Sequence, residues 1–203
     1  MALAKSEWTG NRVRPIEAVD EGGFSLLEVL FATTILIVGV ASLANLFAVS
    51  TKSNTSARST TVAALLAQQK MEQLRGLQWG FDTLGLPLSD SSSDTAVVPE
   101  NPTGGTGLSL SPAGALSSNT AGYVDYLDAN GVSLGGASTT PPTAAIFIRR
   151  WSIEALPTNP NNTLVLQILV TRNKNRGAAD TATGVARLPD EARLVSVKTR
   201  KAT

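Results

Sequence analysis

One uncharged stretch, residues 29–49, limits what this chain can fold into more than any other feature. It is dominated by Ile, Leu, Val and Phe, and about 20 such residues in a helix cross the hydrocarbon core of a membrane. We therefore expect a single transmembrane helix. The alternatives are a buried core helix and a cleaved secretory signal, with Gly39 and Ala41 as small residues at a cleavage site.

A carboxylate, Glu28, lies directly before this stretch. An acidic side chain within a transmembrane helix costs about 2.5–3.5 kcal/mol on insertion scales, so such a residue is a candidate functional site. Near the helix start it can instead reach the membrane interface, where the helix dipole favours a negative charge. The residues by themselves leave both interpretations open.

The residues around Glu28, GGFSLLEVLFA, resemble the class III signal of type IV prepilins and type II secretion pseudopilins. The resemblance implies that a peptidase cleaves after Gly23 and that the new N-terminal residue, Phe24, is N-methylated. It also makes Glu28 the family's assembly glutamate. Two opposite charges attract strongly in a low dielectric, so Glu28 would pair with the N-terminal amine of a neighbouring subunit and set its register.

The leader, residues 1–23, is longer than the short basic leader of many prepilins. Gly22 stands where Lys or Arg often precedes the cleaved glycine. Because basic residues favour the cytoplasmic side, we expect the leader in the cytoplasm and the head in the periplasm, on a single pass of the inner membrane. The resemblance implies that the cleaved protein moves from the membrane into a pilus.

Helix-compatible sequence continues beyond the membrane stretch, since no proline occurs between Pro15 and Pro87. We expect one helix over residues 24–77. Residues 24–49 would form its transmembrane and filament-core half, and residues 50–79 the amphipathic half with its end. The apolar stripe at a period of 3.6 residues consists of Val62, Leu65, Leu66, Leu74 and Leu77.

The remainder, residues 80–203, reads as a β-rich head. Residues 89–122 are rich in Ser, Thr, Gly and Pro and predict a long connection with a short strand at 95–98. Strands are expected at 144–156, 163–173 and 192–200, and the turn sequence PTNPNN makes the first two an antiparallel hairpin. The fold class is α+β, pilin-like, with the long helix packed on a C-terminal antiparallel sheet.

One face of the strand at 163–173 should pack on the helix. It carries Leu164, Leu166, Ile168 and Val170.

The stretch RRWSIEALPTNPNNTLVLQILVTRN further resembles the V-type minor pilins, the type IV pilus modification protein family. This resemblance implies a minor pilin that primes or caps a type IV pilus. Its partners would be the prepilin peptidase, the major pilin, other minor pilins and the inner-membrane assembly platform. A type II secretion pseudopilin, which shares the same processing, is the alternative.

Three oxygen-bearing residues, Asp125, Asp128 and Asn130, are weak candidates for a Ca²⁺ site. Tyr126 occupies the first ligand position of the usual calcium loop pattern, which argues against it. The pair Asn130-Gly131 instead predicts a type I′ hairpin turn. We expect no metal and no cofactor.

Histidine and cysteine are both absent from the 203 residues, which removes the usual general base, zinc ligands and thiol nucleophiles. We therefore expect no enzyme. The net charge of +1 gives no bias toward nucleic acid, but residues 154–203 hold eight basic against four acidic residues. A solvated strand edge is preferred over a nucleic-acid patch for them. They are Arg172, Lys174, Arg176, Arg187, Arg193, Lys198, Arg200 and Lys201.

Overall fold

The computed structural model describes residues 22–175 and 190–201. Within them lie one long N-terminal helix and a C-terminal antiparallel sheet of four strands, so the predicted α+β fold is confirmed. The chain divides into two compact units, residues 1–48 and 49–203. Most of the predicted leader, together with Arg176 and Arg187, lies outside the described residues.

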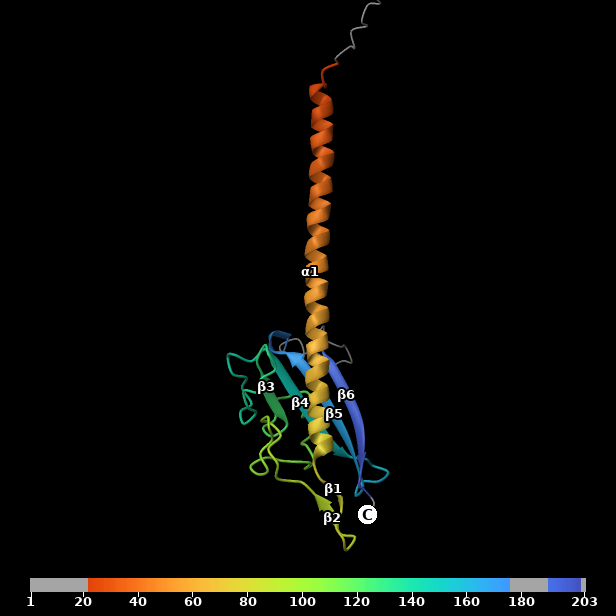
Figure 1. Cartoon of the computed structure of the whole chain (residues 1–203), viewed down its shortest axis with the longest axis vertical. Coiled ribbons are helices and arrows are strands. Elements are labelled where there is room, and N and C mark those ends of the chain that lie inside the picture. Colours follow the sequence, from red (N-terminus) through yellow and green to blue (C-terminus); the bar gives the residue numbers. More distant parts are fainter. Residues whose placement is uncertain (1–21, 176–189, 202–203) are drawn as a thin grey trace, which may run out of the picture. The chain divides into compact units, whose positions relative to one another are not determined.

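Helix α1 spans Leu26–Gly76, close to the predicted 24–77 (Figure 1). It begins after Ser25, whose carbonyl accepts the N–H groups of Glu28 at 2.9 Å and Val29 at 3.2 Å. It ends at a glycine, which has the lowest helix propensity after proline. No proline interrupts it, so the backbone hydrogen bonds run without a break through the polar residues 52–61.

The main sheet has the strand order β3-β4-β5-β6, with every neighbouring pair antiparallel. Its strands are β3 (Val124–Leu127), β4 (Phe147–Ala155), β5 (Thr163–Arg172) and β6 (Ala192–Thr199). The hairpin predicted between 144–156 and 163–173 is the β4–β5 pair, in which Ala155 faces Leu164. The strand predicted at 192–200 is β6.

The core lies between the C-terminal part of α1 and one face of this sheet (Figure 1). Leu164, Leu166, Ile168 and Val170 are each 1% exposed or less, so the predicted face of β5 is confirmed. Trp151 of β4 joins the same cluster and is fully buried. Alternation along the strand is what places these side chains together.

The predicted helix stripe is partly wrong. Leu65 is 61% exposed, whereas Leu66 beside it is buried. Successive residues are about 100° apart around a helix, so Leu65 and Leu66 lie on different faces and only the face with Leu66 is buried. The buried residues of α1 are Ser59, Ala63, Leu66, Ala67, Lys70, Met71 and Leu74.

Two features before β3 differ from expectation. A small hairpin, β1 (Trp79–Phe81) with β2 (Pro87–Ser89), was not predicted. The short strand expected at 95–98 is absent, because the Asp94 carboxylate accepts the N–H of Ala96 at 2.9 Å and turns the chain there.

Candidate functional site

The residues that the sequence singles out lie in an extended segment and the first helical turn of α1. Gly22, Gly23 and Phe24 precede the helix, and the Phe24 side chain is 82% exposed. Glu28 follows in the first turn, where the unpaired N–H groups of the helix favour a carboxylate.

Neither glycine of this segment is required by the packing of the chain itself. A Cβ added to Gly22 or Gly23 would meet no atom within 4 Å, and neither residue adopts the positive φ that favours glycine. A side chain at either position would therefore meet no steric obstacle in the described part of the chain.

Glu28 is exposed and forms no ion pair or side-chain hydrogen bond within residues 22–175 and 190–201. The carboxylate therefore has no intramolecular counter-charge in this part of the chain. In an apolar surrounding such a group is costly unless it gains a counter-charge or reaches the membrane interface.

The helix that carries Glu28 is long and apolar enough to span a membrane once. All residues from 22 to 55 are exposed, so the alternative of a buried core helix finds no support. The hydroxyls of Thr33, Thr34 and Ser42 donate to carbonyls four residues earlier, at 2.9, 2.8 and 2.8 Å. These bonds keep the polar side chains satisfied in a medium without water.

The second cluster of charged residues lies inside the head, and sequence reasoning missed most of it. The Asp125 carboxylate of β3 accepts hydrogen bonds from Arg149 of β4 at 2.7–3.2 Å and lies 3.0 Å from the Lys70 ammonium of α1. All three side chains are fully buried. One sequence signal could have revealed this cluster. Lys70 lies four residues after Leu66 and four before Leu74, and both leucines belong to the predicted apolar stripe.

The remaining donors of this buried cluster bind the backbone around it. Arg149 donates to the Leu66 carbonyl at 2.9 Å, and Lys70 donates to the Thr95 carbonyl and lies 4.0 Å above the Trp151 ring. Burial lowers the pKa of Lys70 to about 8, although Asp125 opposes the change. The cluster links α1, β3, β4 and the loop at 95.

The three weak candidates for a calcium site, Asp125, Asp128 and Asn130, do not point toward a common position. Asp125 is turned into the core, whereas the Asp128 carboxylate accepts the N–H groups of Asn130 at 2.8 Å and Val132 at 2.9 Å. Among the described residues, no group of three acidic side chains is placed to hold a metal ion. The predicted type I′ turn at Asn130-Gly131 is wrong. That turn needs a positive φ at both residues, and only Gly131 has one.

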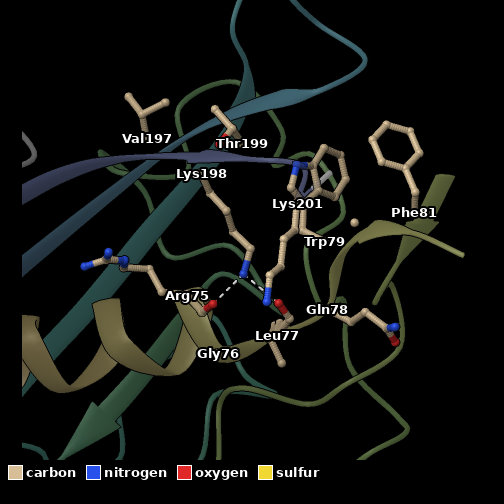
Figure 2. A pocket seen from close by; sticks show the side chains of 11 residues that line it. Arg75, Gly76, Leu77, Gln78, Trp79, Phe81, Val197, Lys198, Thr199 and Lys201 are labelled. Atoms are coloured by element: carbon tan, nitrogen blue, oxygen red, sulfur yellow. Dashed lines mark hydrogen bonds between the residues drawn. The ribbon is translucent and has the colours of Figure 1, made fainter. Parts of the chain in front are cut away.

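A cavity of about 860 Å³ lies where α1 ends against β1 and β6 (Figure 2). The Lys198 ammonium points at the helix end and donates to the carbonyls of Arg75 at 2.5 Å and Leu77 at 2.6 Å. A cation there satisfies carbonyls that the last helical turn leaves unpaired. Burial is the main cause that lowers the pKa of Lys198, and repulsion from the Arg75 guanidinium lowers it further.

Arg200 lies next to this region without lining the cavity itself. Its guanidinium lies 3.6 Å from the centre of the Trp79 ring and donates to the carbonyls of Gly80 and Leu88 at 3.0 Å. Two members of the predicted basic group, Lys198 and Arg200, therefore bind the chain's own backbone. They hold the end of β6 to α1 and to the β1–β2 hairpin.

Comparisons with protein-family models, curated proteins and solved structures each found no match. The structure thus defines a class of protein: a long apolar N-terminal helix packed through its C-terminal part on an antiparallel sheet.

Proposed function

We propose that this protein is a minor pilin of a type IV pilus. In this proposal it is inserted in the inner membrane by residues 29–49, with its head in the periplasm. Prepilin peptidase cleaves it after Gly23 and methylates Phe24, and the shortened chain enters a pilus together with the major pilin. Its role is structural, not enzymatic.

The observation that carries the proposal is the isolated carboxylate of Glu28. It lies in the first turn of an exposed apolar helix, directly after Gly23 and Phe24, and has no counter-charge in the described part of the chain. Cleavage after Gly23 would create a free amine at Phe24. The amine of one subunit and the Glu28 carboxylate of the next would then offset each other's desolvation cost.

The glycines support the same proposal. The chain leaves open space around Gly22 and Gly23, which is compatible with access of a peptidase to the bond after Gly23. The resemblance of residues 149–173 to V-type minor pilins supports a pilus subunit over the secretion alternative.

Processing is the experiment that tests the proposal. We expect co-expression with a prepilin peptidase to remove residues 1–23 and leave a methylated Phe24, as measured by mass spectrometry of the intact protein. Gly23→Val should block the cleavage, since the added side chain crowds the scissile bond. Gly22→Lys is the matched control and should still be cleaved, because many prepilins carry a basic residue there.

An uncleaved wild-type chain, or a new N-terminus near Ser42, would contradict the proposal. The second outcome would identify a secretory signal instead.

A further inference from the structure

The outer edge of β6 is a second surface with a defined chemistry. The Arg200 N–H donates to the Asn162 carbonyl at 2.8 Å, which shows that residue 200 points its backbone toward β5. Backbone direction alternates along an antiparallel strand, so residues 193, 195, 197 and 199 point away from β5. Lys201 continues the same alternation, because its N–H points away from β5 and donates to the Trp79 carbonyl of β1.

Within the described residues, β1 lies beside one end of β6 and pairs its backbone with this edge at Lys201. The N–H and C=O groups of residues 193, 195, 197 and 199 form no backbone hydrogen bond on that side within this part of the chain. Unpaired groups of this kind form a template for an added strand.

The devices that normally protect an edge strand are weak here. Lysine side chains usually do so, but the Lys198 side chain is turned toward the end of α1 and bound there. Val195 and Val197 belong to the residues whose backbone points away from β5, and their side chains are 60% and 55% exposed. Val197 pairs with Val165 of β5 and Val195 with Gln167, so the exposed face next to this edge carries two strand-forming valines beside one polar side chain.

The charges around the edge select the occupant. The cavity at its end is lined by Trp79, Phe81 and three cations, Arg75, Lys198 and Lys201, without an acidic residue (Figure 2). Arg193 lies exposed at the other end, where Asp190 and Glu191 precede β6. A second copy of β6 would bring like charges together, which disfavours self-pairing. An acidic strand would meet opposite charge at the cavity end of the edge.

We propose that this edge binds an extended acidic segment of another protein as a fifth strand of the sheet. The segment pairs its backbone with residues 193–199, places apolar side chains beside Val195 and Val197, and directs a carboxylate toward Lys201. The proposal concerns the head alone and does not depend on cleavage after Gly23 or on pilus assembly.

The test uses the full chain in detergent micelles. The probe is a short, end-blocked fluorescent peptide of alternating valine and threonine with two glutamates at each end. We expect saturable binding by fluorescence anisotropy, and binding at least about tenfold weaker when the glutamates are replaced by lysines. No binding, or equal binding of both peptides, would overturn the proposal.

Val195→Pro isolates the backbone contribution. The Val195 N–H points away from β5, so proline removes an outward donor without removing a bond of the native sheet. We expect at least about tenfold weaker binding, whereas the control Val195→Thr, which keeps the N–H, should bind within about threefold of wild type. Equal binding by the two variants would overturn strand addition.

Two further measurements test the proposal even if the proline variant fails to fold. Hydrogen exchange of the wild-type chain should show fast amides at residues 195, 197 and 199 that slow when the peptide is added; slow exchange without it would mean a closed edge and overturn the proposal. Lys201→Glu should weaken the preference for the acidic peptide, and an unchanged preference would overturn the acidic partner. Self-association that Val195→Pro abolishes would identify a second copy as the occupant and overturn the acidic partner.

Discussion

The buried cluster consists of Lys70, Asp125 and Arg149, and the loss of each charge would affect the other two differently. Asp125 is the anion that contacts both buried cations. Its removal would leave both cations uncompensated, whereas removal of Lys70 leaves the hydrogen-bonded pair of Asp125 and Arg149 intact. Lys70 is therefore the member whose charge is least well supported by its surroundings.

We predict that Lys70 makes the stability of the head depend on alkaline pH. Its pKa is about 8 in the folded chain and 10.5 in the unfolded one, chiefly because burial disfavours the charged form. Between these values the unfolded chain binds more protons. The free energy of unfolding should therefore rise with pH, by up to about 1.4 kcal/mol per unit from this group.

Urea unfolding of the wild type and of Lys70→Met between pH 7 and 10 measures the effect. The wild type should gain stability relative to the variant above about pH 8. Parallel stability curves over the whole range would contradict the prediction.

For Glu28 we predict a variant that is processed but not assembled. Glu28→Ala removes an insertion cost of about 2.5–3.5 kcal/mol, so membrane insertion and cleavage should proceed normally. Assembly should fail, because an unpaired amine in the filament costs about 3–5 kcal/mol. Glu28→Gln should lie between, since it keeps an acceptor without the charge.

Crosslinking in membranes, or pulldown with the major pilin, measures this association. Thr34→Ala is the control, because its hydroxyl is already bound to the Leu30 carbonyl of the same helix. If Glu28→Ala enters the filament at the wild-type level, Glu28 is an interfacial helix-start residue. If the variant is not cleaved, Glu28 acts in peptidase recognition instead.

At the level of elements, the packing of β5 on α1 stabilises the head. We predict that Leu166→Ala lowers the free energy of unfolding by about 2–5 kcal/mol, because the side chain is fully buried in the core cluster and leaves a cavity. Leu65→Ala removes the same atoms from an exposed position of α1 and should change it by less than about 0.5 kcal/mol.

Urea unfolding of a fragment of residues 49–203, which holds the compact unit, separates the two leucines. Equal losses would mean that the assigned helix face is wrong.

At the level of the whole molecule, the apolar helix half and the head serve different surroundings. Residues 22–55 are exposed throughout and suit lipid or neighbouring helices, whereas residues 49–203 hold the core. The processing motif is shared by pili and secretion systems, so it does not distinguish the two machines.

We predict that deletion of the gene reduces piliation and twitching motility and leaves type II secretion unchanged, because residues 149–173 resemble a pilus subunit. Electron microscopy, a twitching assay and an assay of secreted enzymes measure the outcomes. Loss of secretion with normal pili would favour the pseudopilin alternative.

The sequence by itself determined the elements that depend on local chemistry. The bounds of α1 follow from an apolar run, a continuous helical stretch and a terminal glycine, all within one segment. Strands β4 and β5 and the turn between them follow from alternation and turn residues in the same way. The segment around Glu28 could be singled out because its motif is contiguous, and its role stays a prediction.

Only the tertiary structure decided which residues meet across the chain. Asp125 looked like a loop ligand, yet β3 pairs with β4 and places it against Arg149 and under Lys70. The buried helix face excluded Leu65, and Lys198 bound a helix end more than 100 residues earlier. These outcomes depend on strand order and helix rotation, which arise from contacts between segments far apart in sequence, and no local pattern specifies them.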